Sequence, residues 1–191
     1  MNASSGGSND ADLVRAALAG ENAAFSALMT RHKDALYRFV RRYVGDADEA
    51  FDLVQESFVA CWSALDTFDQ ARPFPTWLRR VAINKCRDWS RRRKVRQFFF
   101  RAASLDAAGT EAATIDANSA GPTDEGRMLA LDAAIAALPA ALKEPLLLTL
   151  FEDMSHQEAG RVLNVSAKAI ETRVYRAKQR LRALLGHVAR F

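Results

Sequence analysis

The chain has 191 residues, of which 49% are hydrophobic and 26% charged, and its formal net charge is +4. This composition is ordinary for a globular chain of one domain or two small ones, and no stretch approaches the roughly 18–20 apolar residues of a membrane span. The polar, Gly- and Ser-rich residues 1–11 lack the layout of a signal peptide. We therefore expect a disordered leader there, no membrane insertion and a cytoplasmic protein.

The first half of the chain has the apolar periodicity of packed helices. Apolar residues recur at spacings of three and four over residues 22–44, which predicts a long amphipathic helix that Gly45 can end. A shorter helix is expected before it, over residues 12–19. Another is expected over residues 76–96, after a segment broken by two prolines.

Residues 46–65 predict a helix with two unlike sides. Its outer side carries Asp48, Asp52, Gln55 and Glu56, and no Lys or Arg lies between residues 46 and 56. The inner, apolar side is expected to hold Phe51, Val54, Phe58, Cys61, Trp62 and Leu65. The acidic side stands out in a chain that is basic overall.

A change of composition divides the chain after residue 100. Residues 101–124 are rich in Ala, Gly, Ser and Thr, and beyond Arg101 they contain carboxylates and no basic residue. Because so long a loop is unusual inside one compact domain, we interpret this segment as a flexible linker. It separates a domain over residues 12–100 from a second over residues 125–191.

The second domain ends in the pattern of a helix-turn-helix. After two apolar helices, Ser155 and Glu158 form a predicted capping box, and Asn164 can take the left-handed conformation within a three-residue turn. The inner side of the last helix is expected to hold Ile170, Val174, Ala177, Leu181 and Leu184. With no strand signal, the fold class is all-α: two small helical domains joined by a flexible linker.

Positive charge is clustered in two places. Residues 79–101 hold ten Lys or Arg and one acid, Asp88. Residues 168–182 hold six Lys or Arg and one acid, Glu171. A solvated face or a membrane surface could explain such clusters, but a nucleic-acid partner fits their density better. Phe98, Phe99 and Phe100 lie within the first cluster and cannot all be buried on one helix. No catalytic motif, metal-ligand spacing or phosphate loop occurs, so we expect no enzyme, cofactor, metal or small-molecule substrate. The two cysteines are interpreted as structural thiols in a reducing compartment.

Two stretches resemble the extracytoplasmic-function sigma factors of bacterial RNA polymerase. RRYVGDADEAFDLVQESFVACWSALDTFD, followed by PTWLRRVAINKCRDWSRRRK, is similar to their second conserved region, a helical bundle. LPAALKEPLLLTLFEDMSHQEAGRVLNVSAKAIETRVYRAKQRLRALL is similar to their fourth region, the helix-turn-helix. The resemblance implies a factor that binds core polymerase at the β′ clamp coiled coil and the β flap, recognises promoter DNA, and is controlled by an anti-sigma protein.

The resemblance also implies three sets of site residues. Core polymerase would contact Asp48, Asp52, Leu53, Gln55 and Glu56. The melting −10 element would contact Phe74, Arg79, Arg80, Asn84, Lys85, Arg87, Arg91 and Arg92. The −35 duplex would contact Lys168, Glu171, Thr172, Arg173, Arg176 and Arg180.

Three positions depart from the family pattern. Phe51 replaces an acid, Glu171 stands where a cation is common, and the Phe98–Phe100 run is unfamiliar. Two other functions remain open: a decoy that sequesters an anti-sigma protein, and a stand-alone helix-turn-helix regulator. The basic helix of the first domain argues against the decoy, and the lack of a sustained heptad argues against a dimeric regulator.

Overall fold

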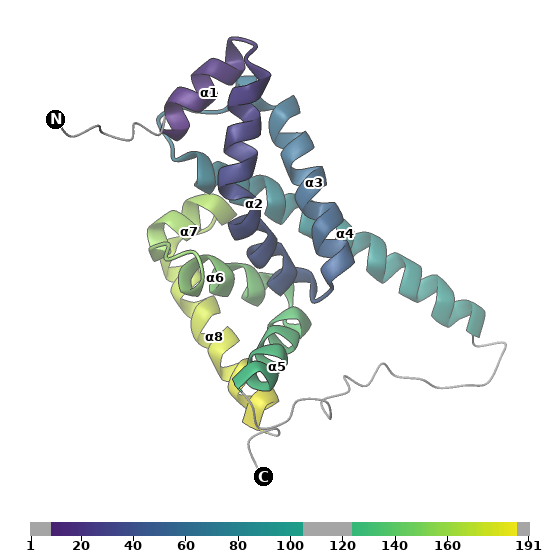
Figure 1. Ribbon diagram of the computed structural model, residues 1–191. Helices are drawn as coiled ribbons and strands as arrows, with labels where there is room; N and C mark the ends of the chain where they lie inside the picture. The colour runs from purple at the N-terminus through teal and green to yellow at the C-terminus, as the bar shows by residue number, and fades with distance from the viewer. Residues whose placement is uncertain (1–8, 105–123, 187–191) are drawn as a thin grey trace.

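The computed structural model describes residues 9–104 and 124–186, and every regular element within these two ranges is helical (Figure 1). The first domain contains α1 (Asp10–Leu18), α2 (Asn22–Val44), α3 (Ala47–Ser63), the 3-10 turn η1 (Leu65–Thr67) and α4 (Phe74–Ser104). The second contains α5 (Asp124–Ala137), α6 (Ala140–Leu150), α7 (His156–Leu163) and α8 (Ala167–Gly186). No helix in the described ranges combines the length and apolarity needed to cross a membrane.

Local side-chain chemistry sets several helix ends. The Asp46 side chain accepts from the Glu49 N–H at 2.9 Å to start α3, and Gly45 ends α2 with φ = 81°. In the second domain the predicted capping box of Ser155 and Glu158 is confirmed, and Asn164 closes α7 with φ = 56°. Capping residues therefore place the turns as the sequence predicts.

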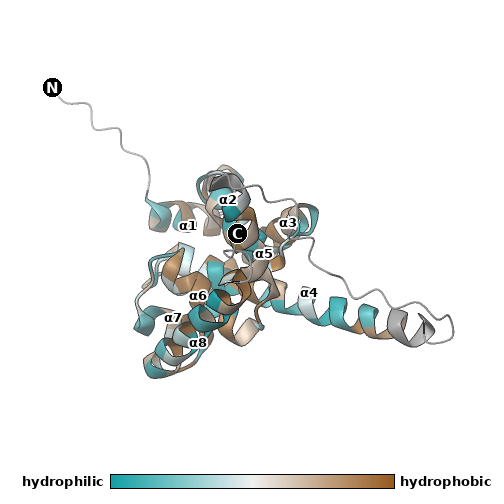
Figure 2. Ribbon diagram, turned by 90° about the horizontal axis from the view of Figure 1, so that it is seen from below, coloured by the Kyte–Doolittle hydropathy of each residue, from teal (hydrophilic) through white to brown (hydrophobic). Residues whose placement is uncertain are grey.

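Other boundaries differ from the predicted ones. The first helix begins at Asp10, inside the predicted leader; the rest of the leader lies outside the described residues. Helix α4 runs to Ser104, past the predicted domain end at residue 100, because nothing in its sequence stops it. The rest of the predicted linker, residues 105–123, lies outside the described ranges. The distal end of α4 projects away from both domains (Figures 1 and 2).

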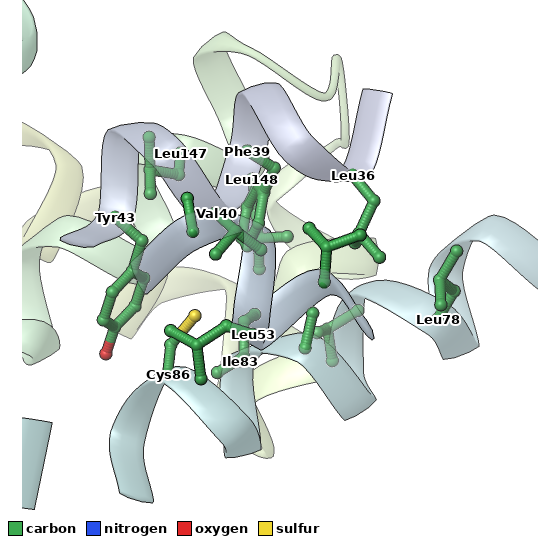
Figure 3. Packing of buried hydrophobic residues seen from close by; sticks show 14 of the residues in the cluster. Leu36, Phe39, Val40, Tyr43, Leu53, Leu78, Ile83, Cys86, Leu147 and Leu148 are labelled. Atoms are coloured by element: carbon green, nitrogen blue, oxygen red, sulfur yellow. The ribbon is translucent and has the colours of Figure 1, made fainter. Parts of the chain in front are cut away.

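The two domains share one hydrophobic core. Phe39, Val40 and Tyr43 of α2 lie with Leu147 and Leu148 of α6 in a continuous buried cluster (Figure 3). Helix α5 also packs against the end of α2, where a Cβ on Gly45 would lie only 2.8 Å from the Cβ of Ala136. The domains thus form a closed arrangement, in which their helices pack directly on each other.

Candidate functional site

The outer side of α3 is acidic, as the sequence predicts. Asp48, Asp52, Gln55 and Glu56 are all exposed, and Glu56 lies 3.9 Å from the ammonium of Lys85 on α4. Leu53 is different, because only 1% of its surface is accessible. Its assignment as a polymerase contact is therefore wrong for this arrangement: its side chain belongs to the domain core.

Three apolar side chains join this outer side. Phe51 is 59% exposed, Val59 65% and Trp62 43%, so placing Phe51 on the inner side was wrong. Trp62 is only partly exposed, because its ring packs against the buried Phe25 of α2 with 4.9 Å between the ring centroids. The buried side of α3 is centred on Ala50, Leu53, Val54, Ser57, Phe58 and Cys61. At about 100° per residue, Phe51 falls to the edge of that arc, and Val59 lies opposite it. Small inner residues such as Ala50 and Ser57 were the signal that sequence reasoning missed.

Most residues predicted for −10 DNA lie along α4 and reach the surface. Arg80, Asn84, Arg91 and Arg92 are exposed, and Lys85 is half-buried. Phe74 is not available, because it is buried in an aromatic cluster with Phe68, Trp77 and His32. In the described arrangement Phe74 is a packing residue, and its assignment as a DNA contact is corrected.

Two predicted DNA cations are paired with carboxylates of the second domain. The Arg87 guanidinium donates to both Glu144 oxygens, at 2.8 and 2.5 Å, and this bonding raises its pKa further. The Nε of Arg79 donates to Glu152 at 2.7 Å, and Arg79 is only 3% exposed. Both cations are therefore paired within the chain in the described arrangement, and their assignment to −10 DNA stays a prediction.

A groove of about 500 Å³ runs between the two domains. Helix α4 lines it with Asn84, Arg87, Arg91 and Lys94, and α8 contributes Arg173. Side chains predicted for the −10 and −35 elements therefore meet at one site.

Helix α8 presents the residues predicted for −35 DNA. Lys168, Glu171, Thr172, Arg176 and Arg180 are exposed, whereas Arg173 is half-buried beside the groove. The Lys168 ammonium donates to Glu171 at 2.8 Å, which lowers the pKa of that carboxyl. The same exposed surface includes Tyr175, at 63% exposure, which the sequence-based set missed, and Leu184, which was expected inside but is 40% exposed.

The distal end of α4 carries exposed apolar side chains among cations. Val95, Phe98 and Phe99 are 55%, 70% and 66% exposed, with the two phenylalanine ring centroids 6.1 Å apart. The side chain of Phe100 lies outside the described residues. The two rings that the structure describes, Phe98 and Phe99, are therefore not buried against another part of the chain.

The cysteines are not reactive centres. Cys61 and Cys86 are free and buried, and burial raises the pKa of each thiol to about 12. At neutral pH both are protonated, and a thiol is a poor nucleophile and metal ligand. In the part of the chain that the structure describes, no three His, Cys, Asp or Glu side chains form a metal-binding group.

Comparison with known proteins identifies both halves of the chain. Residues 28–96 match the family Sigma-70 region 2, and residues 128–181 match Sigma-70, region 4. The first segment includes most of α4 with its cations, and the second, which follows it in the chain, includes α7 and most of α8, the helix-turn-helix.

Known relatives match this chain over nearly their whole length. The RNA polymerase sigma factor NccH of Alcaligenes xylosoxydans xylosoxydans is 38% identical over 92% of this chain and 94% of its own. The ECF RNA polymerase sigma factor SigW of Bacillus subtilis is 29% identical over 87% of this chain and 91% of its own. CnrH, solved in complex with the cytosolic domain of CnrY, superposes with a TM-score of 0.67 at 35% identity, covering 93% of this chain and 97% of that one.

Proposed function

The chain belongs to the extracytoplasmic-function sigma factors, and from that membership we propose that it binds core RNA polymerase and directs it to particular promoters. The observation that carries this proposal is the presence of both sigma regions, in order, over nearly the whole length of the relatives. Catalysis would then belong to the polymerase, and this chain would supply binding and recognition, in the cytoplasm where the polymerase acts.

Each surface has a role in this proposal. The outer side of α3 would meet a basic, partly apolar surface of the polymerase, since it combines Asp48, Asp52 and Glu56 with Phe51 and Val59. The cations of α4 would hold the melted −10 strand by its phosphates, and α8 would enter the major groove of the −35 duplex. Residues 12–100 and 125–191 would act as the two binding units.

We also propose control by an anti-sigma protein. The support is that CnrH, similar to this chain over nearly its whole length, was solved with the cytosolic domain of CnrY bound. A partner of that kind would compete with polymerase for exposed apolar and acidic surface on the first domain.

Run-off transcription tests the central proposal. Purified chain is added to core polymerase on a library of promoter fragments, and the transcripts are sequenced at their 5′ ends. The expected result is initiation at a defined set of sites that depends on the chain. Core binding without any transcript would favour a non-initiating role, and the absence of core binding would refute the proposal.

A further inference from the structure

The distal end of α4 is a charged helix that stands clear of both domains (Figures 1 and 2). Residues 91–96 include five Lys or Arg and no acid. Val95, Phe98 and Phe99 each have more than half of their surface exposed. Strong positive charge and bare apolar surface therefore occur together on one projecting helix.

The apolar side chains of this segment form a single stripe. At about 100° per residue, Val95, Phe98 and Phe99 fall within an arc of about 100°, because they are spaced by three and four. Lys94 and Arg96 lie about 100° to either side of Val95, and both are exposed. The stripe is therefore bordered by a cation on each side.

Phosphate binding by itself does not explain the stripe. The match to Sigma-70 region 2 ends at residue 96, so Phe98 and Phe99 lie beyond it. Unpaired bases can stack on aromatic rings, but Val95 has no ring, and the Phe98 and Phe99 rings pack edge to face at 76°. The stripe indicates an occupant that offers negative charge and an apolar interior together.

We infer that the distal end of α4 binds the surface of an anionic lipid bilayer. The Phe98 and Phe99 rings would lie at the boundary between headgroups and acyl chains, with Lys94 and Arg96 on lipid phosphates. Helices that bind in this way combine aromatic side chains with Lys and Arg, and clusters of four to eight cations on them attract acidic lipids.

The helix would lie on the bilayer and would not cross it. Residues 91–104 extend about 20 Å at 1.5 Å per residue, which is shorter than the hydrocarbon core, and the cations oppose deep burial. This agrees with the finding that no helix in the described ranges can span a membrane. The inference goes beyond the proposed function, because neither polymerase nor promoter takes part in it.

Other occupants fit this surface less well. A second copy of the chain would bring two clusters of five cations together, and like charges across an interface repel. A partner protein with an acidic, apolar surface would satisfy the charge but would need a groove shaped to an isolated helix. A bilayer is planar and fluid, so it accepts a projecting helix without such a groove.

Vesicle flotation of the full-length chain tests the inference. One set of vesicles is phosphatidylcholine alone, and the other contains phosphatidylcholine and phosphatidylglycerol in equal amounts. We expect at least about tenfold stronger binding to the anionic set, since each cation near an anionic surface adds up to about fivefold. Equal binding to both sets would overturn the inference. Absence of binding to either set would also overturn it and would favour a partner protein.

A pair of variants isolates the stripe without changing charge. Phe98→Ala with Phe99→Ala should weaken binding to the anionic vesicles at least about tenfold, because the rings supply the apolar contact. The control, Met128→Ala with Leu129→Ala, removes two side chains of α5 that are 49% and 58% exposed, and it should bind as the unmodified chain does. If the two variants bind alike, the rings do not enter the bilayer and the inference is wrong.

A second pair isolates the charge. Lys94→Gln with Arg96→Gln should weaken binding to the anionic vesicles at least about tenfold. The control, Lys33→Gln with Arg38→Gln, removes two exposed cations of α2 and should weaken it less than about threefold. Circular dichroism checks that all four variants are folded. Equal losses in the two charge variants would show attraction to the whole chain and would overturn the site at the end of α4.

Discussion

Phe51 and Leu53 lie two residues apart on α3 and face opposite ways: Phe51 is 59% exposed and Leu53 only 1%. Phe51 therefore belongs to the outer surface and Leu53 to the core.

Leu53→Ala should lower the free energy of unfolding by about 2–5 kcal/mol, because it opens a cavity. Phe51→Ala should change stability by no more than about 0.5 kcal/mol and should weaken core-polymerase binding. Urea denaturation and surface plasmon resonance measure the two effects; a large stability loss in Phe51→Ala would contradict this division.

The acidic outer side of α3 predicts a charge-dependent contact. Asp52→Arg with Glu56→Arg should weaken core binding at least tenfold while leaving the circular dichroism spectrum unchanged, since both side chains are exposed. Glu21→Arg with Asp34→Arg supplies the same charge change elsewhere. If both double variants bind core polymerase equally, the docking assignment is wrong.

Arg173 and Arg176 offer a matched pair on α8. Arg173→Ala should cost about 1–3 kcal/mol in binding to a cognate −35 duplex if the guanidinium contacts a base edge. Arg176, an exposed residue of the same helix, serves as the comparison. Electrophoretic mobility shifts on cognate and scrambled duplexes separate the roles: equal losses on both DNAs would make Arg173 a phosphate contact only.

The buried thiols predict a loss of stability at alkaline pH. The Cys61 thiol has its pKa raised from 9.0 to about 12 by burial, so the unfolded chain loses this proton at a lower pH than the folded chain does. The contribution of the protonated Cys61 thiol to the free energy of unfolding is therefore fully present below pH 9. It is lost between pH 9 and 12, at up to about 1.4 kcal/mol per pH unit.

Comparison with Cys61→Ala isolates this thiol. Lys143 acts in the opposite sense, because burial lowers its pKa from 10.5 to about 8, and it is common to both proteins. The difference in unfolding free energy between the two proteins, measured by urea titration, should shrink as pH rises above 9. A difference that is constant up to pH 10.5 would show that Cys61 ionises normally.

Local chemistry made much of the fold predictable. The capping box at Ser155, the left-handed Asn164 and the C-cap at Gly45 each act within four residues, and all three are observed. The position of Phe51 on α3 was mispredicted because its apolar side chain suggests an inner side, whereas the packed side includes the small residues Ala50 and Ser57.

The closed arrangement could not be predicted in the same way. A cluster of cations on α4 indicates an anionic partner and does not distinguish DNA phosphates from carboxylates elsewhere in the chain. Arg87 and Glu144 are 57 residues apart, and no periodicity connects them. The DNA contacts proposed for Arg79 and Arg87 stay predictions, because both side chains are paired with carboxylates in the described structure.

Two structural features require a glycine at position 45, which has no Cβ atom. Its left-handed conformation ends α2, and its missing side chain lets α5 approach to within 2.8 Å of where a Cβ would stand. A methyl group placed there would act as a wedge between the domains. It would strain the end of α2 by about 1–2 kcal/mol and would push α5 away without altering any charge. The absence of a side chain at Gly45 therefore sets how closely α5 can approach the end of α2, and this steric effect is independent of the ion pairs between the two domains.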